Sequence, residues 1–388
     1  MNEHPEAAEP PAPPLASRPL AAADARTVLV VAPTPMTGPG TALSFALTDL
    51  AERAAGYASR ASGDGTRAAY GSAWKMYAVW CDAHQRQPLA GDPAQVALYL
   101  TQRAEDGLAV SSLKVARAAI RAAHRLAGVS LDLADPRLAL VMEGITRSKG
   151  TRPTRQAAPV MPDLLRRLLA ALPAPNTPAA AAPALAARHR AMLLLGFGAA
   201  LRRSEIVALT IGDIAVVDGR GLTVLIRRAK GDQQGKGRTL AIWANHREPD
   251  FCPVAAMAAW MAFRVTAADC LAPPAPPALS AAALAANRPL FCGVSSSGVL
   301  SGQAMSDKIV ARLIKQAGAL AGVDPRRLSG HSLRRGLLTT AGDLQLPLID
   351  LMRQSRHKSV DTALGYIEAA DIWRNNITEP VFGGRKPG

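Results

Sequence analysis

A chain of 388 residues is long enough for two domains of ordinary size, and a hydrophobic fraction of 49% is enough to build their cores. Its net charge of +15 and pI near 10.3 give a positive field whose natural partner is a polyanion. No apolar run reaches the roughly 20 residues that span a bilayer, and the acidic, proline-rich start does not resemble a signal peptide. We therefore expect no membrane association, and predict a cytoplasmic, nucleoid-associated protein that binds nucleic acid.

The four cysteines are scattered without a Cys-x-x-Cys spacing, at positions 81, 252, 270 and 292. This pattern favours reduced thiols over a disulfide framework or a zinc site. Aromatic residues make up only 4% of the chain and alanine supplies much of its apolar content, which favours closely packed helices because alanine has the highest helix propensity. The composition predicts a mainly α-helical protein.

The chain divides into segments of different composition. Residues 1–45 are rich in proline and alanine, and we expect them to be disordered because they cannot bury enough apolar surface. Residues 46–145 show helical patterning and form the first predicted domain. Within it, Tyr70, Trp74, Tyr77 and Cys81 are spaced by 4, 3 and 4 residues, which places them on one helix face that we interpret as core.

A second helix of this domain, within residues 111–126, carries one apolar and one cationic face. The cationic face contains no acidic partner and consists of Lys114, Arg117, Arg121 and Arg125. A solvated charged face is the usual interpretation of such a run, but the single sign favours a helix that follows DNA phosphates. Residues 146–159 are basic and interrupted by proline, so they are predicted to be an interdomain linker whose DNA contacts come from Arg147, Lys149 and Arg152.

Residues 160–388 form the second predicted domain. The patterning predicts helices at residues 163–172, 185–199, 253–266, 303–321, 331–344, 347–354 and 359–370. Two β-rich runs at 222–228 and 238–243, separated by a glycine-containing loop, predict a β-hairpin. Residues 267–287 are rich in alanine and proline and are expected to be a surface insertion. The fold class is thus mainly α with a small β-hairpin or sheet.

Several residues of this domain are suited to phosphate chemistry, although each is unspecific alone. Arg202 lies at a predicted helix start, where an anion is favoured, but it could equally pair with Glu205. His331 and Arg334 are spaced to reach one anion from a helix. His357 and Tyr366 taken singly would be assigned to capping or packing.

Their order along the chain resembles the tyrosine recombinase (phage integrase) family. Arg202 stands at the first arginine of the family, with Glu205 as its acidic neighbour, and Lys230 matches the lysine of the hairpin. His331 and Arg334 match the His-x-x-Arg box, His357 the following His/Trp position, and Tyr366, nine residues later, the nucleophile. The resemblance extends from about residue 45, where the first domain is similar to the helical core-binding domain of the family.

Two positions depart from the family pattern. Ala200 and Arg356 stand where the family often has glycine. We expect these differences to affect the local backbone and not the reactive groups.

The resemblance implies a site-specific recombinase that cuts DNA through a 3′-phosphotyrosine. Free tyrosine has a pKa of about 10, so the phenol must lose its proton during attack. Two arginines suit the non-bridging oxygens because a guanidinium supplies both charge and a planar pair of donors. The resemblance implies His331 as the proton acceptor, His357 as a phosphate donor and Lys230 as general acid.

No metal, ATP or other cofactor is expected, and the implied partner is double-stranded DNA held by a homotetramer. Residues 371–388 would be the segment exchanged between protomers. A type IB topoisomerase with a similar catalytic set, and a non-catalytic DNA-binding protein, are the alternative functions.

Overall fold

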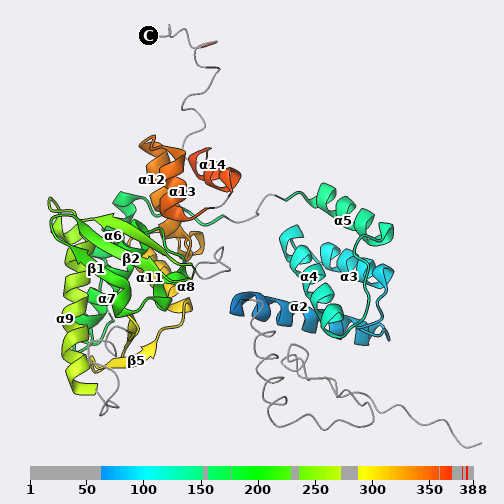
Figure 1. Cartoon of the computed structure of the whole chain (residues 1–388), viewed down its shortest axis with the longest axis horizontal. Helices are drawn as coiled ribbons and strands as arrows, with labels where there is room; N and C mark the ends of the chain where they lie inside the picture. The colour runs from blue at the N-terminus through cyan, green and yellow to red at the C-terminus, as the bar shows by residue number, and fades with distance from the viewer. Residues whose placement is uncertain are drawn as a thin grey trace, which may run out of the picture. The chain divides into compact units, whose positions relative to one another are not determined.

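The computed structural model describes residues 63–151, 156–174, 176–228, 236–271, 287–357 and 359–368, together with residues 378 and 382. The chain separates into two compact units, Met1–Thr154 and Arg155–Gly388 (Figure 1). The predicted tail 1–45, Arg152, Lys230 and almost all of residues 371–388 lie outside the described residues. Within the described residues, no helix has the length and apolar content needed to cross a membrane.

The first unit consists of helices α2 (Asp64–Ala83), α3 (Pro93–Glu105), α4 (Val110–Leu126) and α5 (Pro136–Lys149). Helices α3 and α5 begin alike: an aspartate caps the helix and proline takes its first position, where no amide hydrogen is needed. Helix α2 packs on α4, and α3 packs on α5.

The core of this unit confirms the predicted apolar face of α2 except at Tyr70, which is half-buried and outside the core cluster. Trp74, Tyr77 and Cys81 are buried, and they pack with Leu100 of α3 and Ile120 of α4. The Tyr77 hydroxyl accepts a hydrogen bond from Gln95 at 2.8 Å. These aromatic side chains therefore hold the helices together and are not available to stack on bases.

Helix α5 extends four residues into the segment that was predicted to be a linker. It ends at Lys149, because Gly150 adopts φ +69°, a left-handed conformation that glycine tolerates and that ends helices. The basic residues Arg147 and Lys149 are therefore helical and belong to the first unit.

The second unit begins with α6 (Pro162–Ala170), α7 (Ala182–Gly198) and α8 (Arg203–Ala208). The short 3₁₀ helix η1 (Ile211–Asp213) then leads into an antiparallel sheet of β1 (Ile214–Val217), β2 (Gly221–Ile226) and β3 (Arg238–Trp243) in that order. The predicted hairpin is confirmed as β2–β3. Strand β1 was not predicted, and it pairs with β2 through a tight turn at Gly219, which has φ +69°.

The 3₁₀ helix η2 (Pro249–Phe251) and helix α9 (Pro253–Leu271) follow the sheet. Helix α9 packs on α7 and β2 (Figure 1). It is longer than predicted and includes the first five residues of the expected insertion, whose remaining residues 272–286 are outside the described part.

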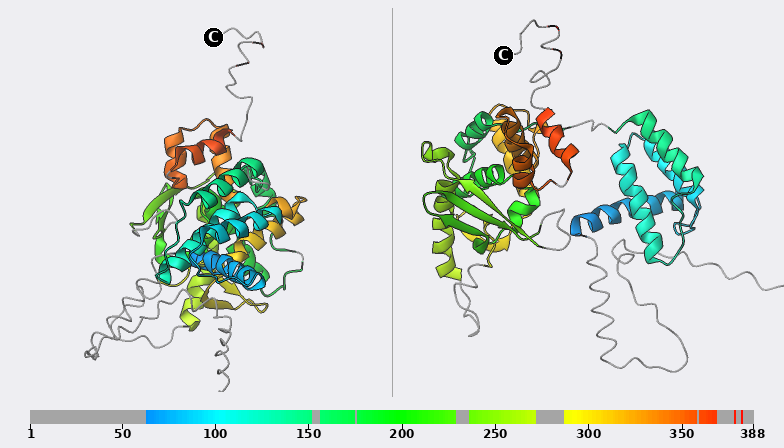
Figure 2. Two further views of the ribbon diagram at one scale, coloured as in Figure 1. Left: turned by 90° about the vertical axis from the view of Figure 1, so that its right-hand side faces the viewer. Right: turned by 45° about the horizontal axis from the view of Figure 1, so that its top comes forward.

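A second hairpin, β4 (Cys292–Val294) with β5 (Leu300–Ala304), precedes α11 (Lys308–Leu320). The predicted helix 303–321 is therefore wrong at its start, because residues 300–304 pair with β4. After η3 (Pro325–Arg327) come α12 (Ser332–Asp343), α13 (Leu348–Ser355) and α14 (Val360–Glu368). These three helices contact one another at one side of the unit (Figures 1 and 2).

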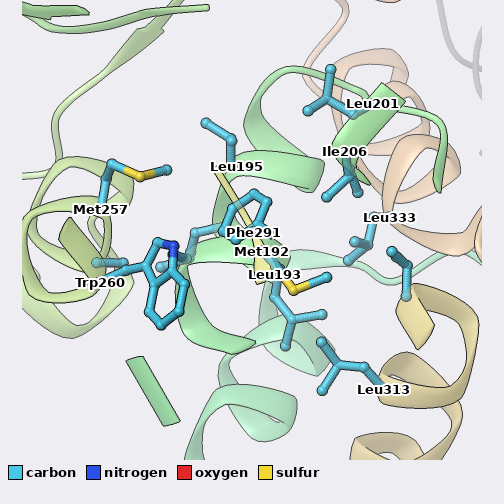
Figure 3. Close-up of a cluster of buried hydrophobic side chains, with 14 of the residues drawn as sticks. Met192, Leu193, Leu195, Leu201, Ile206, Met257, Trp260, Phe291, Leu313 and Leu333 are labelled. Atoms are coloured by element: carbon cyan, nitrogen blue, oxygen red, sulfur yellow. The ribbon is translucent and has the colours of Figure 1, made fainter. Parts of the chain in front are cut away.

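The core of the second unit fixes the segments that carry the predicted site residues. Leu201, Ile206 and Leu333 are almost fully buried in one cluster with Met192 and Leu195 of α7 (Figure 3). Leu201 precedes Arg202, Ile206 follows Glu205, and Leu333 precedes Arg334. The apolar neighbours thus anchor the backbone on both sides of the cationic residues.

Candidate active site

Arg202 and Glu205 form a closed pair at the start of α8. Arg202 is the residue that caps this helix, as predicted. Glu205 accepts a hydrogen bond from the Arg202 amide at 2.9 Å and from its Nη1 at 2.7 Å. The side chain of Glu205 is only 3% exposed, whereas that of Arg202 is 20% exposed. Arg202 can therefore reach a bound anion while its carboxylate partner stays covered.

Arg334 lies on α12 and is buried. Its Nη1 donates to the backbone oxygen of Ala200 at 2.7 Å, and its Nη2 donates to the backbone oxygen of Ser355 and to Nε2 of His357. Burial, reinforced by the positive charges of Arg202 and Arg356, lowers the pKa of Arg334 to about 10. The guanidinium remains charged at neutral pH and joins α12 to both the α8 loop and the end of α13.

His357 lies between Arg334 and Tyr366. A guanidinium can only donate, so Nε2 of His357 accepts the 2.9 Å bond from Arg334, and Nδ1 then carries the proton and donates to Ser355 Oγ at 2.9 Å. Burial, followed by the charges of Arg334, Arg202 and Arg356, lowers the pKa of His357 to about 4. The imidazole is therefore neutral at pH 7 and orients Arg334.

Tyr366 is half-buried on α14. Its ring stacks on that of His357, with the ring centres 5.4 Å apart and the planes tilted by 16°. The guanidinium carbon of Arg335 lies 5.7 Å from the centre of the tyrosine ring. The two contacts place Tyr366 beside the Arg334–His357 pair and next to a second cation.

His331 is exposed at the residue that precedes α12, and its amide donates to Ser329 Oγ at 3.1 Å. It lies one helical turn before Arg334, which is the spacing that was predicted. The structure thus brings Arg202, Glu205, Arg334, His357 and Tyr366 into one connected network, with His331 on the helix that carries Arg334. Lys230 lies outside the described residues.

The two departures from the family pattern share a backbone conformation. Ala200 has φ +47° and Arg356 has φ +62°, a region that L-residues rarely adopt and glycine adopts readily. The expected effect on the local backbone is therefore confirmed. The side chain of Arg356 in addition contacts the supporting carboxylate: its Nη2 donates to Glu205 Oε2 at 2.7 Å and to the Ala200 oxygen at 3.1 Å.

Sequence reasoning missed three contributors to this site. Arg356 neutralises Glu205, Ser355 accepts from Nδ1 of His357, and Arg335 faces the tyrosine ring. Arg335 and Arg356 are each adjacent to a predicted residue, and their basic character was the available signal. Ser355 carried no signal, because its role depends on the turn that follows α13.

The chain matches the model of the Phage integrase family over residues 163–371, more than half of its length. The chain belongs to the phage integrase family. This integrase is accordingly a tyrosine recombinase, an enzyme that cleaves and rejoins DNA strands.

Relatives and solved structures agree with this membership. The integrase is 29% identical over 326 residues to an "Integrase/recombinase xerD homolog" of Selenomonas ruminantium, covering 83% of this chain and 87% of the relative. Its fold is similar to XerH site-specific recombinase in a post-cleavage complex with a palindromic difH substrate, with a TM-score of 0.56 and 17% identity over 86% of this chain and 84% of XerH. The pre-cleavage XerH complex gives a TM-score of 0.51 at 18% identity, over 83% of this chain and 84% of XerH.

The cationic face of α4 is present in the first unit of the integrase. Lys114, Arg121 and Arg125 are exposed opposite the buried apolar face of the helix. Arg117 is half-buried and donates to the backbone oxygen of Leu133 at 3.3 Å, so part of its donor capacity is used within the protein.

Two further residues predicted to bind DNA have partners in the first unit. Arg147 pairs with Glu143 at 3.2 Å, and both side chains are largely exposed. Lys149 Nζ donates to the backbone oxygen of Ala104 at 2.7 Å, in the last turn of α3. Lys149 thus adds a side-chain donor at the end of α3, where the Ala104 oxygen also accepts from the Gly107 amide at 3.0 Å.

The depressed pKa of His357 predicts a stability that falls in mild acid. An unfolded histidine takes up a proton near pH 6.5, whereas folded His357 does so only near pH 4. Between these values the unfolded state binds more protons, so stability decreases as pH falls. Thermal unfolding at pH 7, 6, 5 and 4.5 should show a smaller decrease in Tm for His357→Gln than for the parent protein. Parallel curves would mean that folding leaves the pKa of His357 unchanged.

Proposed function

We propose that this integrase is a site-specific recombinase in which Tyr366 attacks a phosphodiester of double-stranded DNA. The observation that carries the proposal is the linked set of Arg334 on α12, His357 just after α13 and Tyr366 on α14, joined to Arg202 through the Ala200 and Glu205 region. A DNA-binding protein without catalytic function would have no need for a tyrosine held beside the buried Arg334 and a second arginine, Arg335.

The proposed first step exchanges one phosphate ester for another. The Tyr366 oxygen forms a bond to phosphorus, and the bond from phosphorus to the deoxyribose 5′ oxygen breaks. The phenolic proton passes to His331, and the departing 5′ oxygen receives a proton from Lys230. In the second step a 5′-hydroxyl of another strand attacks the 3′-phosphotyrosine, and the protons return along the same route. The ester bond energy is conserved, so resealing the DNA consumes no ATP.

Arg202 and Arg334 are proposed to bind the non-bridging oxygens, where negative charge accumulates in the transition state. Arg202 is part-exposed, and Arg334 is held by three acceptors that fix the direction of its remaining donors. Such preorganisation stabilises charge without reorganising at the moment of reaction. His357 would assist by donating to the phosphate after exchanging one of its present partners.

The assembly proposed for the reaction is a homotetramer on two paired DNA sites, with residues 371–388 exchanged between protomers. Residues 46–145 would serve as a core-binding domain, 146–159 as the crossing segment, and 160–388 as the catalytic domain. DNA contacts are assigned to Lys114, Arg117, Arg121, Arg125, Arg147, Lys149 and Arg152.

A nicked suicide duplex tests this function. The DNA flanking the gene should contain an inverted repeat around a short spacer, and a duplex carrying that repeat with a nick beside the scissile phosphate loses its short strand on cleavage. The integrase should then remain bound to DNA in SDS, and digestion with mass spectrometry should place the DNA on Tyr366. Relaxation of supercoiled plasmids that lack the repeat, at the same rate as plasmids that contain it, would instead indicate a topoisomerase.

The cationic face of α4 is expected to contribute to affinity by neutralising DNA phosphates. Arg121→Ala combined with Arg125→Ala should weaken DNA binding and reduce the slope of log affinity against log salt by about one unit for each phosphate that the variant no longer neutralises. Arg137→Ala, which removes an exposed arginine paired with Asp135 in the same unit, is the matched control. An unchanged slope in the double variant would assign this face to solvent.

A further inference from the structure

We propose that Arg356 is a positioning residue for DNA cleavage: it binds the carboxylate of Glu205 and thereby leaves the Arg202 guanidinium available to the scissile phosphate. This inference rests on the function proposed above, and it concerns a residue that does not itself touch DNA. Its side chain is 5% exposed, against 20% for Arg202.

The contacts of Glu205 show how the carboxylate is divided. One oxygen, Oε1, accepts from Arg202 Nη1 at 2.7 Å, and the other, Oε2, accepts from the Arg202 amide at 2.9 Å and from Arg356 Nη2 at 2.7 Å. Arg356 therefore occupies Oε2 of Glu205, the oxygen that a second guanidinium nitrogen of Arg202 would otherwise bind. Two-point binding is the strongest geometry between these groups, and it would turn Arg202 toward the protein.

The charges of the site point in the same direction. Burial alone would raise the pKa of the Glu205 carboxyl, but the charge of Arg356 and the charge and hydrogen bonds of Arg202 hold that pKa below its ordinary value. Glu205 is thus an anion next to the place where a phosphate would bind. Arg202 and Arg356 share the single negative charge of Glu205. Because Arg356 balances that charge, a net positive charge remains at Arg202.

Arg356 also ties together the two segments that carry the reactive groups. Its Nη1 donates at 3.0 Å to the backbone oxygens of Ala199 and Gln354, and its Nη2 donates to that of Ala200, which also accepts from Arg334. Residue 356 has a left-handed backbone in which glycine would be unstrained. An arginine persists in such a conformation only where its surroundings hold it firmly.

The Arg356→Gly variant separates the side chain from the backbone. Glycine suits φ +62°, so relief of backbone strain should offset part of the stability lost with the Arg356 hydrogen bonds, and the variant should fold with a Tm below that of the parent protein. On the nicked duplex that carries the flanking inverted repeat, we expect cleavage to slow by about 10- to 100-fold. Losses of this size are typical when a residue that only orients a functional group is removed, as at metal sites. DNA affinity should change little. Arg356→Lys should be intermediate. Arg353→Ala, from the helix α13 that precedes Arg356 and paired with Asp350 on the surface, should match the parent.

A second substrate distinguishes positioning from simple structural support. A methylphosphonate at the scissile position lacks one anionic oxygen, so a guanidinium clamp matters less there. The defect of Arg356→Gly should shrink on this substrate if the variant acts by withdrawing Arg202 from the phosphate. The lysine variant provides the same comparison if the glycine variant unfolds.

Three results would overturn the proposal. Parent-like cleavage by Arg356→Gly would show that the guanidinium is dispensable. An equal defect on both substrates would mean that Arg356 only supports the fold. Absence of a covalent adduct from the parent protein would remove the proposed function and this inference together, and it is recognised without any variant.

Discussion

Replacing Tyr366 with phenylalanine is expected to abolish the covalent protein–DNA adduct and to leave folding and DNA affinity intact. Phenylalanine keeps the ring that stacks on His357 and faces Arg335, so the packing of α14 is unchanged. Only the oxygen that would attack phosphorus is removed. Removal of a nucleophile typically lowers the rate by about 10⁴-fold or more, which places cleavage below detection on a denaturing gel.

The measurement compares adduct formation on the nicked duplex with binding in a gel-shift titration. Tyr70→Phe is the matched control, because Tyr70 is a half-buried tyrosine of α2 in the other unit, and this variant should cleave like the parent. An SDS-resistant complex formed by the Tyr366→Phe protein would show that another residue is the nucleophile.

Replacing Arg334 with alanine is expected to slow cleavage by about 10²- to 10³-fold, the effect typical of losing one donor to a transition-state oxyanion. DNA affinity should change far less, because phosphates elsewhere supply most of the binding energy. The reason for the large effect is structural as well as electrostatic. Arg334 is the group through which the backbone oxygens of Ala200 and Ser355 and the ring of His357 are held together.

The same burial gives the alanine variant a cost in stability, since it removes one hydrogen-bond donor each from the backbone oxygens of Ala200 and Ser355 and from the ring of His357. Arg334→Lys is therefore needed beside it: lysine retains charge and much of the volume but lacks the planar pair of donors. We expect the lysine variant to fold and still cleave slowly. If cleavage and affinity fell by equal factors in both variants, Arg334 would be an anchor for DNA and not a participant in the reaction.

The sequence predicted the helical class, the β2–β3 hairpin and most helices of the second unit, because these depend on local patterns of apolar residues and on turn residues. It failed at strands that are too short or too polar to show an alternating apolar pattern. Strand β1 and the β4–β5 hairpin are short, with exposed or polar residues, and are stabilised by their partners. Residues 303–304 accordingly lie in a strand, although they continue into a helical pattern.

The sequence alone determined which reactive groups this protein carries and the order in which they occur. Both follow from the identity and position of each residue, and folding changes neither. Only the tertiary structure decided how those groups are used. It placed Arg356 on Glu205, turned His357 to hold Arg334, and gave Ala200 and Arg356 a left-handed backbone. Contacts between residues that lie far apart in the chain, such as Glu205 and Arg356, follow from how helices pack, and no local pattern in the chain encodes them.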